Sequence, residues 1–489
     1  MKSLLAAALA LGLVAAAPTV PAGHRPAAVI HHPIACNAGA QAAFDRGLLD
    51  YYAYNPEAAE HEFYTAVDLD GHCPMAWWGV AQSNAPNLNV PATDDRDDQA
   101  RQAIATAKGL EQYATPEDAA FIEAASALFN TDMTAAHEPQ LIAYRDALKA
   151  IADKYPDDPD AAALYSEASL YALVGGSWPQ QALMTDAQRA DFAAQGAALL
   201  PYFQASIAKF PKHVGLLHYF IHAAQFADDS KAAVAAALQL GAFDLPANAS
   251  HLTHMPGHTF FDVGMYADAL GVGTRSVAMD AADYACCHPG YYSSTRYYHG
   301  HNVDFVLYAM TQTGHLDDAI GIARGFDRHG FLARQLVAAG RWSDVAALPA
   351  NPSEGYTGAY ARAIAYAHLG DAANARAAIA ALPQMKNPAF DEFFDAMRQT
   401  VEGEIAVAAK DDGKALPLLQ AASTSLAAGM HLQPTEIPPL YFYSPDLALA
   451  RVAERLGKND IARTALQAEL VASPQSPAAL AMLAKLGTN

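Results

Sequence analysis

Histidines gather in three short motifs in the middle of this chain. The motifs are HYFIH, HLTHMPGH and YYHGHNVDF, and they contain His218 and His222, then His251, His254 and His258, then His299 and His301. Neutral imidazole is a common transition-metal ligand, and it is also the side chain that titrates nearest to neutral pH. If the motifs meet in space, they therefore predict a metal-binding or catalytic pocket.

The spacing within each motif favours helices that present the histidines on one side. His218 and His222 are four residues apart, which places both on one face of a helix. His251, His254 and His258 follow an i, i+3, i+7 pattern, but Pro256 interrupts it. That proline either kinks the helix or marks its first turn, so His258 is the safest ligand of the three.

A recurring turn indicates which elements position these motifs. A glycine at a turn is followed five residues later by a small residue, in the pairs Gly264–Ala269, Gly314–Ala319, Gly370–Ala375 and Gly457–Ala462, and more weakly in Gly340–Val345. The glycine permits a tight turn, and the small residue lets a second helix pack on the first. Each histidine motif lies on what we interpret as the first helix of such a unit, and first helices of stacked units lie side by side on the concave face.

Packed helices lie about 8–10 Å apart, so imidazoles on neighbouring first helices can reach one ion. We therefore predict one shared pocket. Its expected metal ligands are His218, His222, His254, His258 and His301; its expected second-shell or additional ligands are His251, Asn87, Asn89, Tyr298 and Asn302. The alternative is a buried hydrogen-bonded network that fixes helix register. His31, His32 and His315 are interpreted as surface or end positions.

The residues around the histidines are compatible with several metals and with a catalytic site, but they do not identify the metal or the reaction. Asp304 lies three residues after His301, and a His/carboxylate mixture suits zinc, copper or iron without distinguishing them. Asp304 or Glu167 is the candidate general base if the site is catalytic. Tyrosines at positions 291, 292, 297 and 298 form a loop that would shield an open coordination position.

Composition sets the fold class. The chain has 489 residues, of which 52% are hydrophobic and 17% charged, and alanine is frequent. These values argue against disorder and favour closely packed helices, so we predict an all-α, helix-turn-helix solenoid. The formal net charge of −21 argues against a nucleic-acid partner.

The N-terminal segment and the cysteines indicate export. Residues 1–22 have a lysine, an apolar stretch and small residues, which together are typical of a cleaved signal peptide; no later segment is apolar enough to span a membrane. We expect a periplasmic or secreted protein, in which disulfides form readily. Cys36 and Cys73 flank a predicted helical hairpin and are expected to pair. Cys286 and Cys287 are adjacent in the sequence. They could form a vicinal disulfide, stay as buried thiols or bind a metal, and the sequence does not decide among these states.

The helix-turn-helix units resemble tetratricopeptide repeats. The histidine motifs further resemble a little-characterised group of exported bacterial repeat proteins with the patterns HYxIHxxE, HxxHMPxH and YxxHNxHF, and AWWGVAQSNAPNLNVP resembles that group's WGxA…GPNxN segment. A boundary near Gly325 to Gly330 further predicts a lobe carrying the site over residues 30–326 and ordinary repeats over residues 327–489. This chain departs from the group at Gln225, where a glutamate is usual, and at Asp304, where a histidine is usual.

Three functions follow from these patterns. The first is a metal-binding pocket on the concave face that takes a small ligand or a partner. The second is a periplasmic scaffold for a peptide or protein in the concave groove, without metal or catalysis. The third is a metal-dependent hydrolase or oxidoreductase. Whether the protein is an enzyme is left open.

Overall fold

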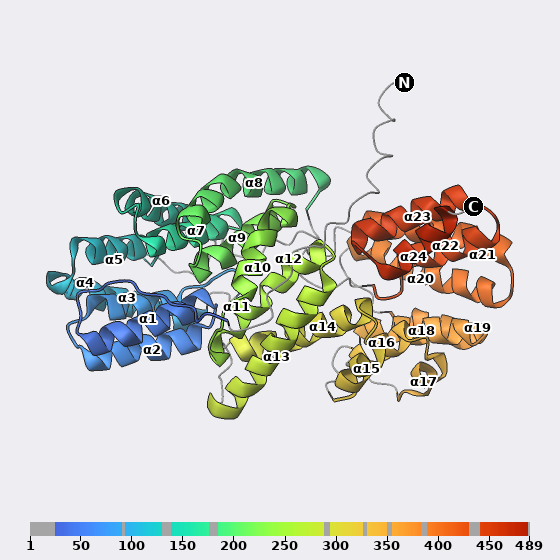
Figure 1. Cartoon of the computed structure of the whole chain (residues 1–489), viewed down its shortest axis with the longest axis horizontal. Helices are drawn as coiled ribbons and strands as arrows, with labels where there is room; N and C mark the ends of the chain where they lie inside the picture. Colours follow the sequence, from blue (N-terminus) through green and yellow to red (C-terminus); the bar gives the residue numbers. More distant parts are fainter. Residues whose placement is uncertain are drawn as a thin grey trace, which may run out of the picture.

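The computed structural model describes residues 25–89, 93–129, 138–175, 184–287, 294–325, 330–349, 355–382, 389–429 and 441–487. Helices α1 to α24 follow one another along these residues (Figure 1), and the only β structure described is a single bridge between Ala27 and Asp244. The predicted all-α class is confirmed. The expected signal segment, residues 1–22, lies outside the described residues.

The helices of the N-terminal half are α1 (Ala38–Tyr52), α2 (Pro56–Leu69), α3 (Pro74–Asn84), α4 (Asp94–Gly109), α5 (Pro116–Leu128), α6 (Glu138–Lys154), α7 (Pro159–Leu173), α8 (Asp186–Lys209), α9 (Val214–Phe226), α10 (Val234–Gly241), α11 (Ser250–His254), α12 (Pro256–Asp262), α13 (Tyr266–Cys287) and α14 (Ser294–Gln312). Those of the C-terminal half are α15 (Leu316–Gly325), α16 (Phe331–Ala338), α17 (Trp342–Ala347), α18 (Gly355–His368), α19 (Ala372–Ala380), α20 (Ala389–Ala408), α21 (Asp412–Gly429), α22 (Pro445–Arg455), α23 (Asn459–Ala472) and α24 (Pro477–Gly487). Consecutive helices pack as antiparallel pairs, as in α1 with α2 and α20 with α21.

The predicted glycine turns are confirmed. Gly264, Gly314, Gly340, Gly370 and Gly457 all have φ between 66° and 83°, the left-handed region that costs glycine little and other residues more. The residue five positions later is buried in every case: Ala269, Ala319, Val345, Ala375 and Ala462. Each turn therefore reverses the chain and sets a small side chain against the preceding helix.

The segment that precedes α1 is held to the body at two places. Cys36, just before α1, forms the predicted disulfide with Cys73, which caps α3. A bond that closes a loop of this length contributes about 4 kcal/mol in the chain-entropy model. Farther upstream, the bridge between Ala27 and Asp244 joins the segment to the chain after α10.

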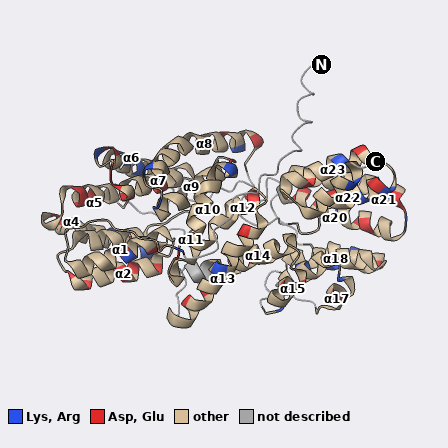
Figure 2. Ribbon diagram, in the orientation of Figure 1, with Lys and Arg blue, Asp and Glu red and all other residues tan. Residues whose placement is uncertain are grey.

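The largest hydrophobic core lies in the N-terminal half, from α1 to α14, and the helices with the histidine motifs run through it. Helices α9 and α11 contain no Lys, Arg, Asp or Glu, and Figure 2 shows this central region almost free of charged residues. Its polar groups are chiefly imidazoles and hydroxyls. No helix in the described part of the chain combines the length and the hydropathy that a membrane crossing needs.

The loop predicted around the tyrosines at 291, 292, 297 and 298 is shorter than expected, because α13 continues to Cys287 and α14, which includes positions 297 and 298, begins at Ser294. Pro289 and Gly290, which suggested the loop, fall in the short interval between these helices, so they do not prevent helix on either side. Tyr291 and Tyr292 of the expected shielding loop, and the side chain of Tyr297, lie outside the described residues.

Candidate metal centres

The structure separates the motif histidines into two neighbouring groups. His218 and His222 of α9 meet His251 of α11, and we call these three the inner triad. His254 at the end of α11, His258 of α12 and His301 of α14 form the outer triad. Within each triad, one nitrogen of every imidazole lies within 4.8 Å of the others. The nearest described rings between the triads, those of His251 and His254, have centroids 6.1 Å apart.

This division refines the prediction of one shared pocket, because the histidines form two adjoining groups of potential ligands. Pro256 is the local cause, because α11 ends at His254 and α12 begins at Pro256, so the three histidines of the second motif do not share one uninterrupted stripe. His251, expected in a secondary role, is grouped with His218 and His222. The other two, His254 and His258, face α14 instead.

A backbone carbonyl fixes the inner triad. The Nδ1 of His218 lies 2.8 Å from the carbonyl oxygen of Tyr52, at the end of α1. A carbonyl only accepts, so Nδ1 carries the proton, and the Nε2 of neutral His218 presents its lone pair. That lone pair faces the Nε2 of His222 at 3.1 Å. A backbone partner on one imidazole nitrogen that orients the other is the usual support of a metal-ligating histidine.

His251 completes the inner triad without hydrogen bonds of its own. The residue is 2% exposed, and neither ring nitrogen has a hydrogen-bond partner among the described residues. Its ring stacks on Tyr54, with centroids 5.6 Å apart, and Tyr54 also contacts His218 at 4.6 Å. A buried polar side chain with no partner is uncommon in folded proteins, and an ion between the three imidazoles would supply one.

The outer triad brings three Nε2 atoms together. The Nε2 of His254 lies 2.8 Å from the Nε2 of His258 and 3.1 Å from the Nε2 of His301. One Nε2 has either a single proton or a single lone pair, so His254 cannot make a normal hydrogen bond to both neighbours. A metal ion takes a lone pair from each nitrogen. Nitrogens roughly 2.1 Å from an ion and 90° apart would be separated by about 3 Å, which is close to these distances.

Burial keeps these imidazoles neutral. It lowers the pKa of His222 to about 3 and that of His301 to about 4. It also holds the pKa of His218, His251 and His254 well below the usual value, and neighbouring histidines add to that effect. Neutral imidazole is the form that ligates a metal, so binding near neutral pH would require no proton to be released from these rings.

Of the predicted neighbours, Tyr298 contacts a triad. Tyr298 lies against the His251 ring, with centroids 4.7 Å apart, and Phe305 contacts all three rings of the outer triad at 4.5–4.8 Å. Asn302 donates from Nδ2 to the buried Asp280 at 2.9 Å, and the Nδ1 of His299 lies 3.0 Å from the same carboxylate oxygen. His299 is therefore in α14 and is engaged with Asp280, outside both triads.

The other predicted site residues lie elsewhere. Asp304 forms an ion pair with Arg334. Glu167 accepts a hydrogen bond from Tyr51 at 2.5 Å, and it lines a small pocket with Asn87. The side chain of Asn87 accepts from the backbone of Asn89, 2.9 Å away. Neither candidate general base belongs to a group of potential ligands in the described chain.

Of the alternatives for Cys286 and Cys287, the structure shows the disulfide. Cys286 and Cys287 form a vicinal disulfide at the end of α13, so neither presents a thiolate to a metal in this structure. Asp283 lies close to both sulfur atoms. The pair is separate from the triads.

Sequence reasoning missed three contributors to buried polar clusters. The Tyr52 carbonyl and the Tyr54 ring approach the inner triad from α1 and its end, and no local pattern signals such a long-range contact. His32 was interpreted as a surface or end residue, but it is 4% exposed and faces Asp158 and Asp160. Its histidine neighbour, His31, is exposed as expected.

Comparison with known proteins leaves the family open. Neither a protein-family model nor a curated protein sequence matches this chain. Among solved structures, the chain is similar to one in the structure of Naa15/Naa10 bound to HypK-THB, at 11% identity over 92% of this chain and 90% of that chain, with a TM-score of 0.19. That TM-score is too low to equate the two folds. The chain's own helices and turns show an all-helical repeat protein with buried histidine triads.

Proposed function

We propose that this chain is an exported helical-repeat protein that binds transition-metal ions at its imidazole triads. The outer triad is the principal site, and a small ligand or a partner would approach it from the side of His301, which is partly exposed. Zinc, copper and iron all suit imidazole ligands, and the ligand set does not select among them.

One observation carries this proposal: the Nε2 of His254 is within 3.1 Å of two other Nε2 atoms at once. A hydrogen-bonded network would distribute donors and acceptors in pairs, and buried polar groups are normally paired in that way. Three converging ring nitrogens make a poor network and a good ligand set. His251, with both ring nitrogens lacking partners, supports the same reading at the inner triad.

Export and the repeat subgroup remain parts of the proposal. The Cys36–Cys73 disulfide is consistent with an oxidising compartment, and the signal-like N-terminal segment supports periplasmic or secreted localisation. The glycine turns support a tetratricopeptide-like repeat, and the motifs support the exported bacterial subgroup. We keep the two-lobe division, residues 30–326 and 327–489, as part of this proposal.

A second candidate is a scaffold that works without metal. A groove of about 780 Å³ lies between the C-terminal end of α14 and helices of the C-terminal half, among them α16 and α22 to α24. Its wall includes Trp342 stacked on His368, with centroids 4.0 Å apart, and the side chain of Arg451. Aromatic and cationic side chains in one groove suit a peptide or partner protein. The hydrolase or oxidoreductase alternative has weaker support, because Asp304 and Glu167 are engaged with Arg334 and Tyr51.

Elemental analysis of protein purified without an affinity tag tests the proposal. We expect stoichiometric transition metal in the wild type and one equivalent less in a His258→Ala, His301→Ala double variant that keeps its helical circular dichroism, because that variant removes ligands of the outer triad only. His315→Ala is the matched control, since His315 directly follows α14, the helix of His301, but its side chain is exposed. A metal-free wild type that also fails to bind added Zn²⁺, Cu²⁺ or Fe²⁺ would contradict metal binding. Peptide binding that survives the double variant would then favour the scaffold.

A further inference from the structure

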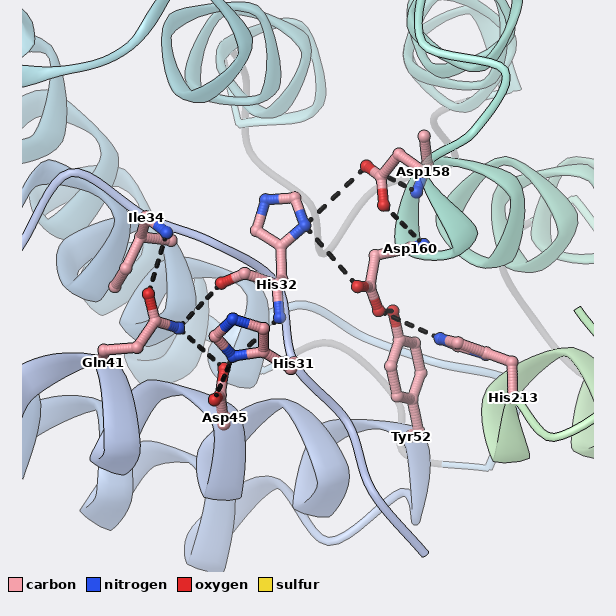
Figure 3. Close-up of polar contacts among 10 residues, drawn as sticks. His31, His32, Ile34, Gln41, Asp45, Tyr52, Asp158, Asp160 and His213 are labelled. Carbon is pink, nitrogen blue, oxygen red and sulfur yellow. Dashed lines mark hydrogen bonds and ion pairs between the residues drawn. The ribbon is translucent and has the colours of Figure 1, made fainter. Parts of the chain in front are cut away.

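A third cluster of ligand-type side chains lies outside both triads, at the start of α7. His32, in the segment before α1, points between Asp158 and Asp160 (Figure 3). The Nδ1 of His32 is 3.5 Å from an oxygen of Asp160 and 3.7 Å from an oxygen of Asp158. All three groups come from segments that the histidine motifs do not include.

The carboxylates of this cluster are already oriented by other groups. Asp158 caps α7: its two oxygens accept from the backbone nitrogens of Asp160 at 2.9 Å and Ala161 at 3.1 Å. One oxygen of Asp160 accepts from the Tyr52 hydroxyl at 2.6 Å and lies 3.0 Å from the Nε2 of His213. The other oxygen of Asp160 is therefore left to face His32, as Figure 3 shows.

His32 itself makes no hydrogen bond through its ring. The residue is 4% exposed, and both ring nitrogens are buried without a hydrogen-bond partner. Separations of 3.5 and 3.7 Å are longer than a normal N–H···O bond. They are close to the roughly 3.3 Å that separates two ligands about 2.05 Å from a tetrahedrally coordinated ion.

The local charge also favours a cation. Glu117, at the start of α5, lies beside His32 and Asp158, and one of its carboxylate oxygens is buried without a hydrogen-bond partner. Asp158 and Asp160 thus face His32, and Glu117 adds a third carboxyl group next to Asp158. Carboxylates that face one another in a buried region repel unless a positive charge lies between them.

We propose that His32, Asp158 and Asp160 form a structural site for a divalent transition-metal ion such as Zn²⁺. The bound ion ties the segment before α1 to the start of α7, two parts of the chain more than 120 residues apart in sequence. The site is distinct from the triads, and it is closed on most sides by protein. A mixed His/carboxylate set suits zinc or manganese better than copper(I), which prefers sulfur.

A proton on the His32 imidazole competes with the metal ion as the positive charge between His32 and the two carboxylates. Burial lowers the pKa of His32, but Asp158 and Asp160 outweigh that effect and raise it to about 10. An imidazolium would then satisfy the two carboxylates without a metal. The two occupants differ in what added Zn²⁺ does to the segment, and that difference can be measured.

Hydrogen exchange of the full-length protein, followed by mass spectrometry with and without Zn²⁺, tests the site. At a free Zn²⁺ concentration 100 times the dissociation constant, openings that release the ion should become about 100-fold rarer, so exchange in the peptides covering residues 25–36 should slow accordingly. Equilibrium dialysis should show one Zn²⁺ equivalent fewer in Asp158→Asn and in His32→Gln than in the wild type. Asparagine is also a preferred N-cap residue, so Asp158→Asn removes the charge and keeps one of the two cap hydrogen bonds through its single amide oxygen.

His31→Ala is the matched control, because His31 is adjacent, exposed and bonded to Asp45. It should keep the wild-type Zn²⁺ content and the wild-type protection. Unchanged exchange of residues 25–36 on adding Zn²⁺ to the wild type would overturn the proposal, whatever the variants do. Equal Zn²⁺ content in wild type and Asp158→Asn would overturn it as well, and would identify the cluster as an imidazolium ion pair.

Discussion

The two triads use the same side chain in different settings. The inner triad is fully buried, and the Tyr52 carbonyl and the Tyr54 ring hold it in place. The outer triad spans three helices, includes the half-buried His301 and packs on Phe305. A closed site favours retention of an ion, whereas a site with an accessible ligand favours exchange and ligand binding. We therefore assign a structural role to the inner triad and a functional role to the outer triad.

Removing one ligand from each triad should have the largest effect. His258→Ala is expected to weaken Zn²⁺ binding at the outer triad by at least about 100-fold, since first-shell losses exceed the 10- to 100-fold typical of outer-shell changes. His222→Ala should weaken the inner site by a similar factor and leave the outer site intact. Competition titration with a chromophoric chelator measures both. If either variant abolished binding at both triads, the triads would be one site, as the sequence alone suggested.

The region around the inner triad should also make the folding stability depend on pH. Tyr54 lies between His218 and the buried Glu167, and burial raises the pKa of Glu167 to about 7. A carboxyl with a raised pKa favours the fold most below its unfolded pKa near 4.5, and that contribution is lost as the pH rises through 7. We expect about 2 kcal/mol less stability at pH 8 than at pH 5 from this group.

Glu167→Gln should remove that part of the pH dependence. Denaturant unfolding at several pH values between 5 and 8 measures it. His315→Ala, which changes an exposed residue, should keep the wild-type slope. An identical slope in wild type and Glu167→Gln would show that Glu167 is ionised equally in the folded and unfolded chains.

The difference in access should appear in kinetics. We expect EDTA to remove metal from the outer triad at least about tenfold faster than from the inner triad, because the inner site requires local opening of the core. Stopped-flow and manual-mixing traces of metal release from the His222→Ala and His258→Ala variants assign each phase. Equal release rates from the two triads would remove the distinction between a closed and an open site.

Packing around the outer triad should have the smallest effect. Phe305→Leu shortens the side chain that contacts His254, His258 and His301, and it should cost about 1 kcal/mol of stability. Zn²⁺ affinity at the outer triad should fall less than about tenfold, because the ligands remain. Thermal unfolding and chelator competition provide the two readouts. A loss of affinity as large as that of His258→Ala would show that Phe305 positions the ligands.

Local sequence signals predicted the parts of the fold that depend on local geometry. A glycine that must adopt positive φ, as at Gly264 or Gly314, is visible in the sequence, and so is the small residue that follows it. The disulfide of Cys36 and Cys73 followed from the ends of one helical hairpin. The four-residue spacing of His218 and His222 likewise predicted their contact, because one helix determines it.

The groups that hold the clustered side chains in place come from contacts that the local sequence does not contain. The carbonyl that orients His218 belongs to Tyr52, 166 residues earlier in the chain. His32 precedes the first helix in a segment without helical periodicity, and its burial comes from α5 and α7. Asp304 shares a helix with His301, yet Arg334 of α16 holds its carboxylate.

X-ray absorption at the metal edge of the Zn²⁺-loaded protein tests the central claim most directly. With one equivalent of Zn²⁺, we predict several imidazole nitrogens at about 2.0–2.1 Å and the multiple scattering typical of imidazole rings. That signature should weaken in His258→Ala and persist in His315→Ala. A wild-type spectrum with oxygen ligands alone would contradict the claim that these triads bind metal.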